Sequence, residues 1–178
     1  SSRGLGDVYK RQSRNKALVA VACYEYRDTS IGSYNEVGVA VATVPCHTKA
    51  PPFPWLALYQ PVDYRHLGFT VIDLPVTTGI ACAGGRELWG FPKFVTDISF
   101  SLTQSGFRCT VQDPDADTKI VDIHGKPGLG IPAPQLDLVL YSLREKEMLR
   151  SLAITRGGGR LSLPGSLRLH LGKSEHPM

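Results

Sequence analysis

Short runs of apolar residues, broken by clusters of turn-forming residues, recur along the chain from Ala17 onward. Apolar or alternating runs of this length, bounded by Gly, Pro, Asn and Asp, are typical of strands. They predict strands over residues 17–26, 36–44, 55–60, 68–74, 93–102, 106–112, 119–124, 136–142, 149–155 and 167–171. The spacing favours a mainly β fold, a single antiparallel β-barrel-like domain with a few short helices.

Residues 79–89 depart from this pattern. Their apolar positions recur near helical spacing, and Thr77 or Thr78 can cap a helix that begins just after them. Two adjacent glycines weaken the helix, Gly90 ends it, and the proline two residues later prevents its continuation. The segment therefore predicts a helix of two or three turns, a Gly-Phe-Pro turn, and a strand that Lys93 opens.

Residues 1–12 match neither a strand nor a helix pattern. We interpret them as a non-native leader, such as a tag or a translated adaptor leaves, and exclude them from the fold. Residues 13–178 are then expected to form the β-barrel-like domain. A chain of 178 residues fits one domain and is long enough to bury a substantial core.

Composition and charge exclude several classes of protein. No apolar run reaches the ~18 residues of a membrane span, and no signal peptide is visible, so neither a membrane protein nor a secreted one is expected. The net charge is +4, and no basic run is interleaved with aromatic residues, which argues against a nucleic-acid partner. The four cysteines lack metal-ligand spacing, so we expect reduced thiols in a cytoplasmic protein.

Two motifs that can mark ligand sites fit ordinary turns better. The acidic run over 113–117 lacks the glycine and the glutamate that complete an EF-hand calcium loop, which leaves a hairpin turn. The glycines over 157–159 are not followed by a helix pattern, which leaves a flexible hairpin rather than a phosphate loop. The histidines show no metal-ligand spacing, so we expect no metal site.

Lys93 carries the most specific chemistry in the sequence. It follows a Gly-Phe-Pro turn and precedes Phe94 and Val95, with Trp89 close by. Desolvation by such groups destabilises an ammonium ion, and a neutral amine attacks a ketone to form a Schiff base. Strand alternation, however, places Lys93 on the face of Asp97, as for a surface lysine. Both readings stay open, because the polar inner face of a barrel lines a cavity.

Glu36 opens the second predicted strand, and its neighbours on the same face are the small residues Gly38, Ala40 and Ala42. Small neighbours leave room beside a carboxylate. This pattern fits an acid that handles protons or orients groups inside a cavity, and it equally fits an exposed glutamate at the end of a strand.

The segment GRELWGFPKF over 85–94, with LPVTTGIACAGG before it and VTDISF after it, resembles the signature of the acetoacetate decarboxylase family. SYNEVGVAV over 33–41 is similar to that family's glutamate-bearing strand. LHLGKSEHPM at the end of the chain is similar to the Leu-Gly-x-His-Pro pattern of family members. The resemblance covers most of residues 17–178.

The resemblance implies a cone-shaped antiparallel barrel, a homo-oligomer, and decarboxylation of acetoacetate or a related β-keto acid to a ketone and CO2 without a cofactor. Lys93 holds the place of the lysine that forms the Schiff base. Glu36 matches the active-site glutamate, as an acid/base or orienting group. Arg86, Trp89 and Phe94 are the predicted substrate-binding residues.

Three departures from the family pattern bear on these expectations. Phe94 stands where the decarboxylases carry a second lysine, and a second family carboxylate falls on Ala22. The family's N-terminal arginine segment has no counterpart. Because family members also continue beyond the His-Pro at which this sequence stops, we expect a domain truncated at both ends. Two alternatives stay open. The same imine can serve aldol condensation or dehydration of another keto acid, and a barrel of this kind can bind a small apolar ligand without chemistry.

Overall fold

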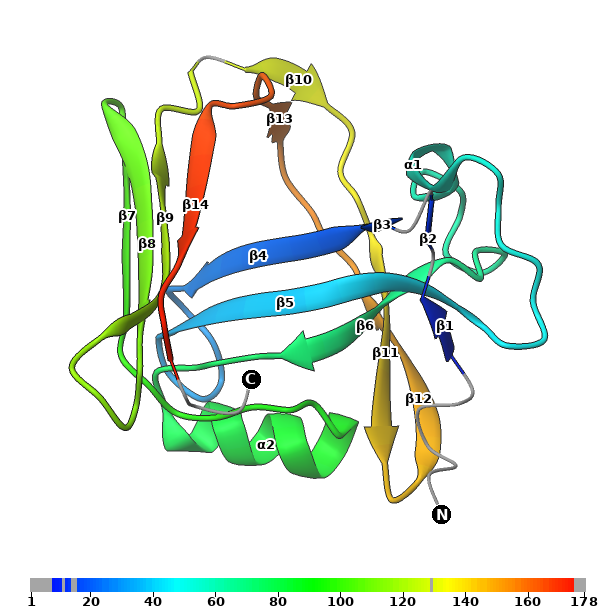
Figure 1. Cartoon of the computed structure of the whole chain (residues 1–178), viewed down its shortest axis with the longest axis horizontal. Helices are drawn as coiled ribbons and strands as arrows, with labels where there is room; N and C mark the ends of the chain where they lie inside the picture. Colours follow the sequence, from blue (N-terminus) through cyan, green and yellow to red (C-terminus); the bar gives the residue numbers. More distant parts are fainter. Residues whose placement is uncertain (1–7, 11, 14–15, 129, 175–178) are drawn as a thin grey trace.

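The computed structural model describes residues 8–10, 12–13, 16–128 and 130–174, and most of them lie in strands (Figure 1). The predicted mainly β fold is confirmed. The description as barrel-like is loose, because the strands form several separate sheets and none of these closes on itself within the described part of the chain. Closure requires a continuous circle of strand pairs, and among the described residues the outer strands of these sheets do not pair with one another.

The largest sheet is built around β5, which pairs with β1, β4 and β6, while β6 continues through a parallel pairing to the hairpin β11–β12. Its strands are β1 (Val8–Lys10), β4 (Val19–Tyr26), β5 (Tyr34–Pro45), β6 (Gly68–Asp73), β11 (Leu138–Arg144) and β12 (Glu147–Ala153). The segment interpreted as a leader thus contributes β1 to this sheet.

A second, four-stranded sheet stands at one end of the first (Figure 1), with the order β14-β9-β8-β7. Its strands are β7 (Ile98–Thr103), β8 (Gly106–Gln112), β9 (Lys119–Gly125) and β14 (Leu167–Leu171). Two small pairs complete the β structure: β2 (Gln12–Ser13) with β3 (Lys16–Ala17), and β10 (Ile131–Ala133) with β13 (Gly159–Leu161).

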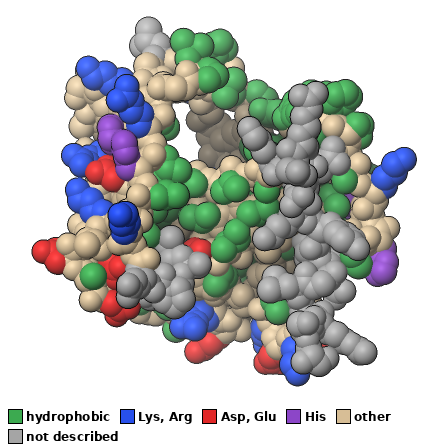
Figure 2. All heavy atoms as spheres, viewed as in Figure 1, with side chains coloured by type: hydrophobic (Ala, Val, Ile, Leu, Met, Phe, Trp, Pro, Cys, Tyr) green, Lys and Arg blue, Asp and Glu red, His purple; other side chains and the backbone are tan. Residues whose placement is uncertain are grey.

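Two clusters of buried apolar side chains hold the sheets together. One lies between the sheets, where Val37 of β5 packs with Cys109 and Val111 of β8, while Cys23 and Phe94 pack against its edge. The other is formed mainly by residues of β5 and β6, among them Ala42, Val44 and Phe69. Figure 2 shows that the molecule is also hollowed on one face, with hydrophobic side chains around the hollow. Burial of apolar surface in the two clusters is the main stabilising contribution to this fold.

The predicted helix is confirmed as α2 (Gly79–Trp89). Thr78 is its N-cap residue but makes no side-chain capping hydrogen bond, and Gly90 ends the helix with a φ of 62°, a left-handed conformation that suits glycine. Neither helix of the described chain has the length or the apolar stretch that a membrane crossing needs.

Two predicted strands differ from the structure. The strand over 55–60 is wrong: the chain there forms the short helix α1 (Pro54–Ala57), which begins with a proline whose fixed φ suits a first helical turn. The strand predicted to begin at Lys93 begins instead at Ile98. Residues 93–97 make backbone hydrogen bonds with a different segment, and this difference determines where the side chain of Lys93 lies.

Candidate active site

Lys93 and Glu36 form a buried ion pair, although 57 residues separate them in the sequence. The amine Nζ of Lys93 donates a hydrogen bond to the carboxylate Oε2 of Glu36. Both residues are buried, with 8% and 6% of their surfaces exposed. The surface-lysine reading and the exposed-glutamate reading are therefore wrong. A lysine and a glutamate are almost never buried unless they are paired, and here they pair with each other.

Glu36 lies near the start of β5, where the backbone is held on both sides. On one side, Tyr24 of β4 is its direct cross-strand partner. On the other side, the N–H of Val37 donates to the carbonyl of Pro75 (3.1 Å), and Thr77 N–H donates to the carbonyl of Asn35 (3.1 Å). The carboxylate therefore projects from a central and well-supported strand position.

Lys93 is held by the same short segment that flanks Glu36. Val76 forms isolated bridges with both Glu36 and Val95. The N–H of Val76 donates to the carbonyl of Phe94 (2.9 Å), and the N–H of Thr96 donates to the carbonyl of Val76 (3.0 Å). Because one backbone segment is hydrogen-bonded to the surroundings of both residues, the contact between the lysine and the glutamate is set by main-chain geometry.

Helix α2 covers the aliphatic part of the Lys93 side chain at Gly85. A Cβ at Gly85 would lie less than 3.0 Å from Cδ and Cε of Lys93, closer than real Cβ atoms approach, and 3.2 Å from Nζ. The neighbouring Gly84 has no such contact within 4 Å. Sequence reasoning treated the glycine pair only as a weakness of the helix and missed Gly85, although a glycine inside a helix often marks a close approach.

Three tyrosines surround the glutamate side of the pair. Burial, with a smaller contribution from the negative charge of Glu36, raises the pKa of Tyr24, Tyr26 and Tyr34 above the usual value for a phenol. Their hydroxyl groups therefore stay protonated at neutral pH. Sequence reasoning also missed these residues; the signal was their alternate spacing in the two strands, which places them on the face of Glu36.

The structure does not bring the three predicted substrate-binding residues together. Phe94 packs against the cluster of Val37 and Ile98 between the sheets. Arg86 is exposed, and Trp89 is 45% exposed, near the end of α2. Their contact with a substrate stays a prediction. Among the described residues, no group of three or more His, Cys, Asp and Glu side chains lies close enough to hold a metal ion.

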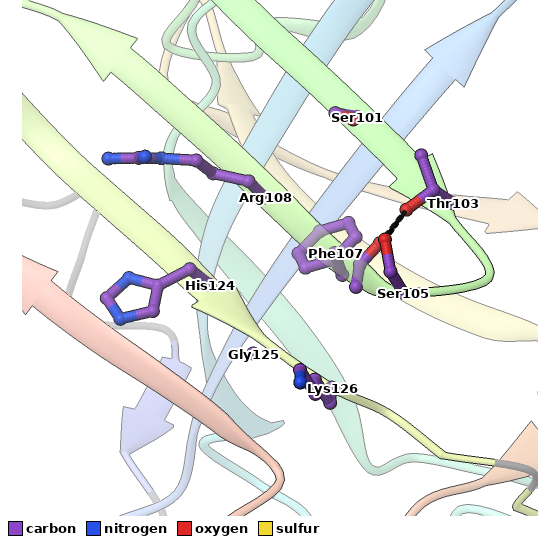
Figure 3. Close-up of a pocket in the computed structure, with 9 residues that line it drawn as sticks. Ser101, Thr103, Ser105, Phe107, Arg108, His124, Gly125 and Lys126 are labelled. Atoms are coloured by element: carbon purple, nitrogen blue, oxygen red, sulfur yellow. Dashed lines mark hydrogen bonds between the residues drawn. The ribbon is translucent and has the colours of Figure 1, made fainter.

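A separate pocket of about 400 Å³ lies on the four-stranded sheet, away from the ion pair (Figure 3). Figure 3 shows Arg108 and His124 extending in the same direction from neighbouring strands, and Thr103 hydrogen-bonded to Ser105 at 2.9 Å. Arg108 is already paired with the carboxylate of Asp122 at 2.7 Å. This pocket carries exposed charges but no buried amine, so the ion pair is the stronger candidate for chemistry.

Comparison with known proteins identifies a family for most of the chain. The model of the family described as acetoacetate decarboxylase (ADC) matches residues 11–164. No curated protein matches the chain at the level of sequence.

Two solved structures share the fold at low sequence identity. The crystal structure of acetoacetate decarboxylase from Legionella pneumophila is 16% identical, with a TM-score of 0.64, and the match covers 95% of this chain and 64% of that one. A structure described under structural studies of acetoacetate decarboxylase is 15% identical, with a TM-score of 0.60, and the match covers 88% and 62%. The chain thus spans less than two thirds of the length of these neighbours.

Proposed function

The chain belongs to the acetoacetate decarboxylase family, and on that premise we propose that it is a lyase that forms a Schiff base at Lys93 and removes CO2 from acetoacetate or a related β-keto acid. The observation that supports this proposal most is the buried contact between the Lys93 amine and the Glu36 carboxylate. A nucleophilic amine next to a proton acceptor, both shielded from water, is the arrangement that attack on a ketone carbon requires.

The first step in this proposal is a proton transfer within the pair. An ammonium ion has no lone pair, so Lys93 must lose a proton before it attacks. Oε2 of Glu36 accepts the hydrogen bond that Nζ donates, so this carboxylate is the group placed to take the proton. Glu36 is therefore proposed as the base that frees the amine and as the acid that later returns the proton.

The bond changes then follow in order. Nζ of Lys93 bonds to the ketone carbon, the ketone oxygen leaves as water, and a protonated imine remains. The bond between the carboxylate and its neighbouring carbon breaks, CO2 leaves, and the electron pair moves into an enamine. A proton supplied through Glu36 adds to the enamine carbon, and water releases the ketone and restores the amine.

Release of CO2 from acetoacetate tests this proposal directly. The unmodified chain is expected to produce CO2 and acetone in equal amounts. The variant Lys93→Met, which keeps the length of the side chain and removes the nucleophile, is expected to lose the activity completely. Turnover by Lys93→Met at the rate of the unmodified chain would overturn the proposal.

A second reaction class uses the same imine for aldol condensation or dehydration of another keto acid. The observation that favours it is Phe94, an apolar side chain packed against the core where the family's decarboxylases carry a second lysine. Pyruvate offered together with an aldehyde distinguishes the two reactions. A condensed product without CO2 release would support the second reaction, and CO2 release from acetoacetate would support the first.

A further inference from the structure

The three tyrosines beside Glu36 form one continuous row across β4 and β5. Tyr24 is the cross-strand partner of Glu36, and Tyr26 is the partner of Tyr34. Alternate residues of a strand point to the same face, so all four side chains share one face of this strand pair. The ring centroids of Tyr24 and Tyr26 are 5.8 Å apart, and those of Tyr26 and Tyr34 are 4.5 Å apart, with interplanar angles of 26° and 23°. We call these three residues the tyrosine ladder.

The rings of the tyrosine ladder are partly exposed to solvent. Tyr24, Tyr26 and Tyr34 are each only partly buried. A partly exposed row of rings is a surface on which a further flat or apolar group can pack, because aromatic rings gain from offset or edge-to-face contacts beyond the area they bury. The innermost ring, Tyr24, stands directly opposite the glutamate that contacts Lys93.

A pocket of about 260 Å³ lies next to the outer end of the ladder. Tyr26 and Tyr34 belong to both the ladder and the pocket wall, which is completed by Glu25, Arg27, Ser33, Asn35 and Thr77. Asn35 immediately precedes Glu36, and its backbone N–H donates a hydrogen bond to the Thr77 hydroxyl at 3.0 Å. Glu25 and Asn35 alternate with the ladder residues along the two strands, so their side chains lie on the opposite face of this strand pair. A substrate group held at Lys93 would therefore meet the rings of the ladder and not this pocket.

We infer that the tyrosine ladder determines substrate specificity, and that the preferred substrate is a β-keto acid whose ketone carries an aromatic or extended apolar group. This inference rests on the proposed function. With the ketone carbon at Lys93, a methyl group would leave the rings uncovered, whereas a longer group would lie along Tyr24 toward Tyr26. The phenols stay neutral beside Glu36, because burial and that carboxylate's charge raise their pKa, so the wall does not repel an apolar group.

A pair of substrates of equal intrinsic reactivity tests the inference. Acetoacetate is compared with its benzyl-extended analogue, in which a benzyl group replaces one hydrogen of the terminal methyl group. We expect kcat/KM of the unmodified chain to favour the extended acid by roughly tenfold, and Tyr24→Leu to abolish that preference mainly by raising KM for the extended acid. Tyr24→Phe, which keeps the ring, is expected to retain it.

The control is Tyr64→Leu, because Tyr64 is 80% exposed and lies outside the ladder; this variant is expected to keep the preference. Equal kcat/KM for both acids in the unmodified chain, or equal losses for both acids in Tyr24→Leu, would overturn the inference. Where Tyr24→Leu does not fold, Tyr24→Phe and the unmodified chain are compared with Tyr26→Leu, for which the same loss of preference is expected.

A second measurement separates failure of this inference from failure of the proposed function. Borohydride reduction in the presence of acetone or of benzylacetone traps any imine at Lys93 without requiring decarboxylation. Trapping of benzylacetone in preference to acetone supports the inference that the tyrosine ladder determines substrate specificity. Equal trapping of both ketones overturns the inference about substrate specificity but still supports imine formation at Lys93. Trapping of neither ketone overturns the proposed function itself.

Discussion

Gly85 lies against the side chain of Lys93, so closely that a Cβ at this position would come within 3.0 Å of both Cδ and Cε of the lysine. Helix α2 therefore presents a bare backbone surface to the proposed nucleophile. A glycine inside a helix costs about 1 kcal/mol relative to alanine. That cost is offset here by space for the lysine.

The variant Gly85→Ala is expected to lower imine formation at Lys93 at least tenfold, because its methyl group displaces the lysine stem from Glu36. The matched control is Gly84→Ala in the same helix, where a Cβ meets no other atom within 4 Å. That variant is expected to keep activity and to raise the free energy of unfolding by up to about 1 kcal/mol. Equal activity of the two variants would contradict the proposed packing.

The buried ion pair predicts a large coupling in stability. Glu36→Gln leaves the Lys93 amine buried without its counter-charge, and we expect the free energy of unfolding to fall by about 3–5 kcal/mol, as for other broken buried pairs. The double variant Glu36→Gln with Lys93→Met removes both charges and is expected to recover most of that loss. Urea denaturation followed by circular dichroism measures both values.

The control for the ion pair is Glu25→Gln, which breaks the exposed contact between Glu25 and Arg27. Exposed pairs contribute at most about 1 kcal/mol, so the effect is expected to be small. Equal free energies of unfolding for the Glu36→Gln variant and the double variant would contradict the predicted coupling between the two buried charges.

Two cysteines in the cluster between the sheets are expected to react differently. A hydrogen bond from the Cys109 thiol lowers the pKa of Cys23, whereas the contact with Cys23, together with burial, raises the pKa of Cys109. Because the thiolate is the reactive form, iodoacetamide is expected to label Cys23 well before Cys109. Peptide mass spectrometry measures both rates. The variant Cys109→Ala should slow labelling of Cys23, and unchanged labelling would count against the thiol contact.

The tyrosine ladder predicts a loss of stability in alkaline solution. In the unfolded chain, a phenol ionises near its ordinary pKa of 10.0, whereas burial and Glu36 raise the pKa of Tyr26 in the folded chain. The folded state therefore keeps a proton that the unfolded state loses, so stability is full below about pH 10 and declines above it. Denaturation from pH 8 to about pH 11 measures this slope, and Tyr26→Phe should reduce it; an unchanged slope in Tyr26→Phe would contradict the prediction.

Local patterns in the sequence predict much of this fold. Strand β8 (Gly106–Gln112) and β14 (Leu167–Leu171) match their predicted ranges, and α2 ends at Gly90 as expected. These elements are determined by apolar spacing and by the conformational preference of glycine, both of which act within a few residues. Sheet closure depends on pairing between distant strands, which local patterns do not determine, and within the described residues no sheet closes into a barrel.

The environment of Lys93 shows the same limit at the scale of one residue. Alternation along the predicted strand placed its side chain with exposed Asp97, but the regular strand begins only at Ile98. Residues 92–96 are instead hydrogen-bonded to residues 74–76, which lie almost twenty positions earlier and carry no local signal of that pairing. The structure brings the lysine and the glutamate into contact, and local periodicity gave no signal of that contact. Only the family resemblance had named both residues as parts of one site, and their catalytic roles stay a prediction.

The most direct test of the account is site-mapped trapping of the imine. The unmodified chain is incubated with acetoacetate and reduced with borohydride, and the modified peptide is identified by mass spectrometry. The account predicts one isopropyl group on Nζ of Lys93, with greatly reduced labelling in Glu36→Gln and none in Lys93→Met. Labelling spread over exposed lysines, with Lys93 unmodified, would contradict it.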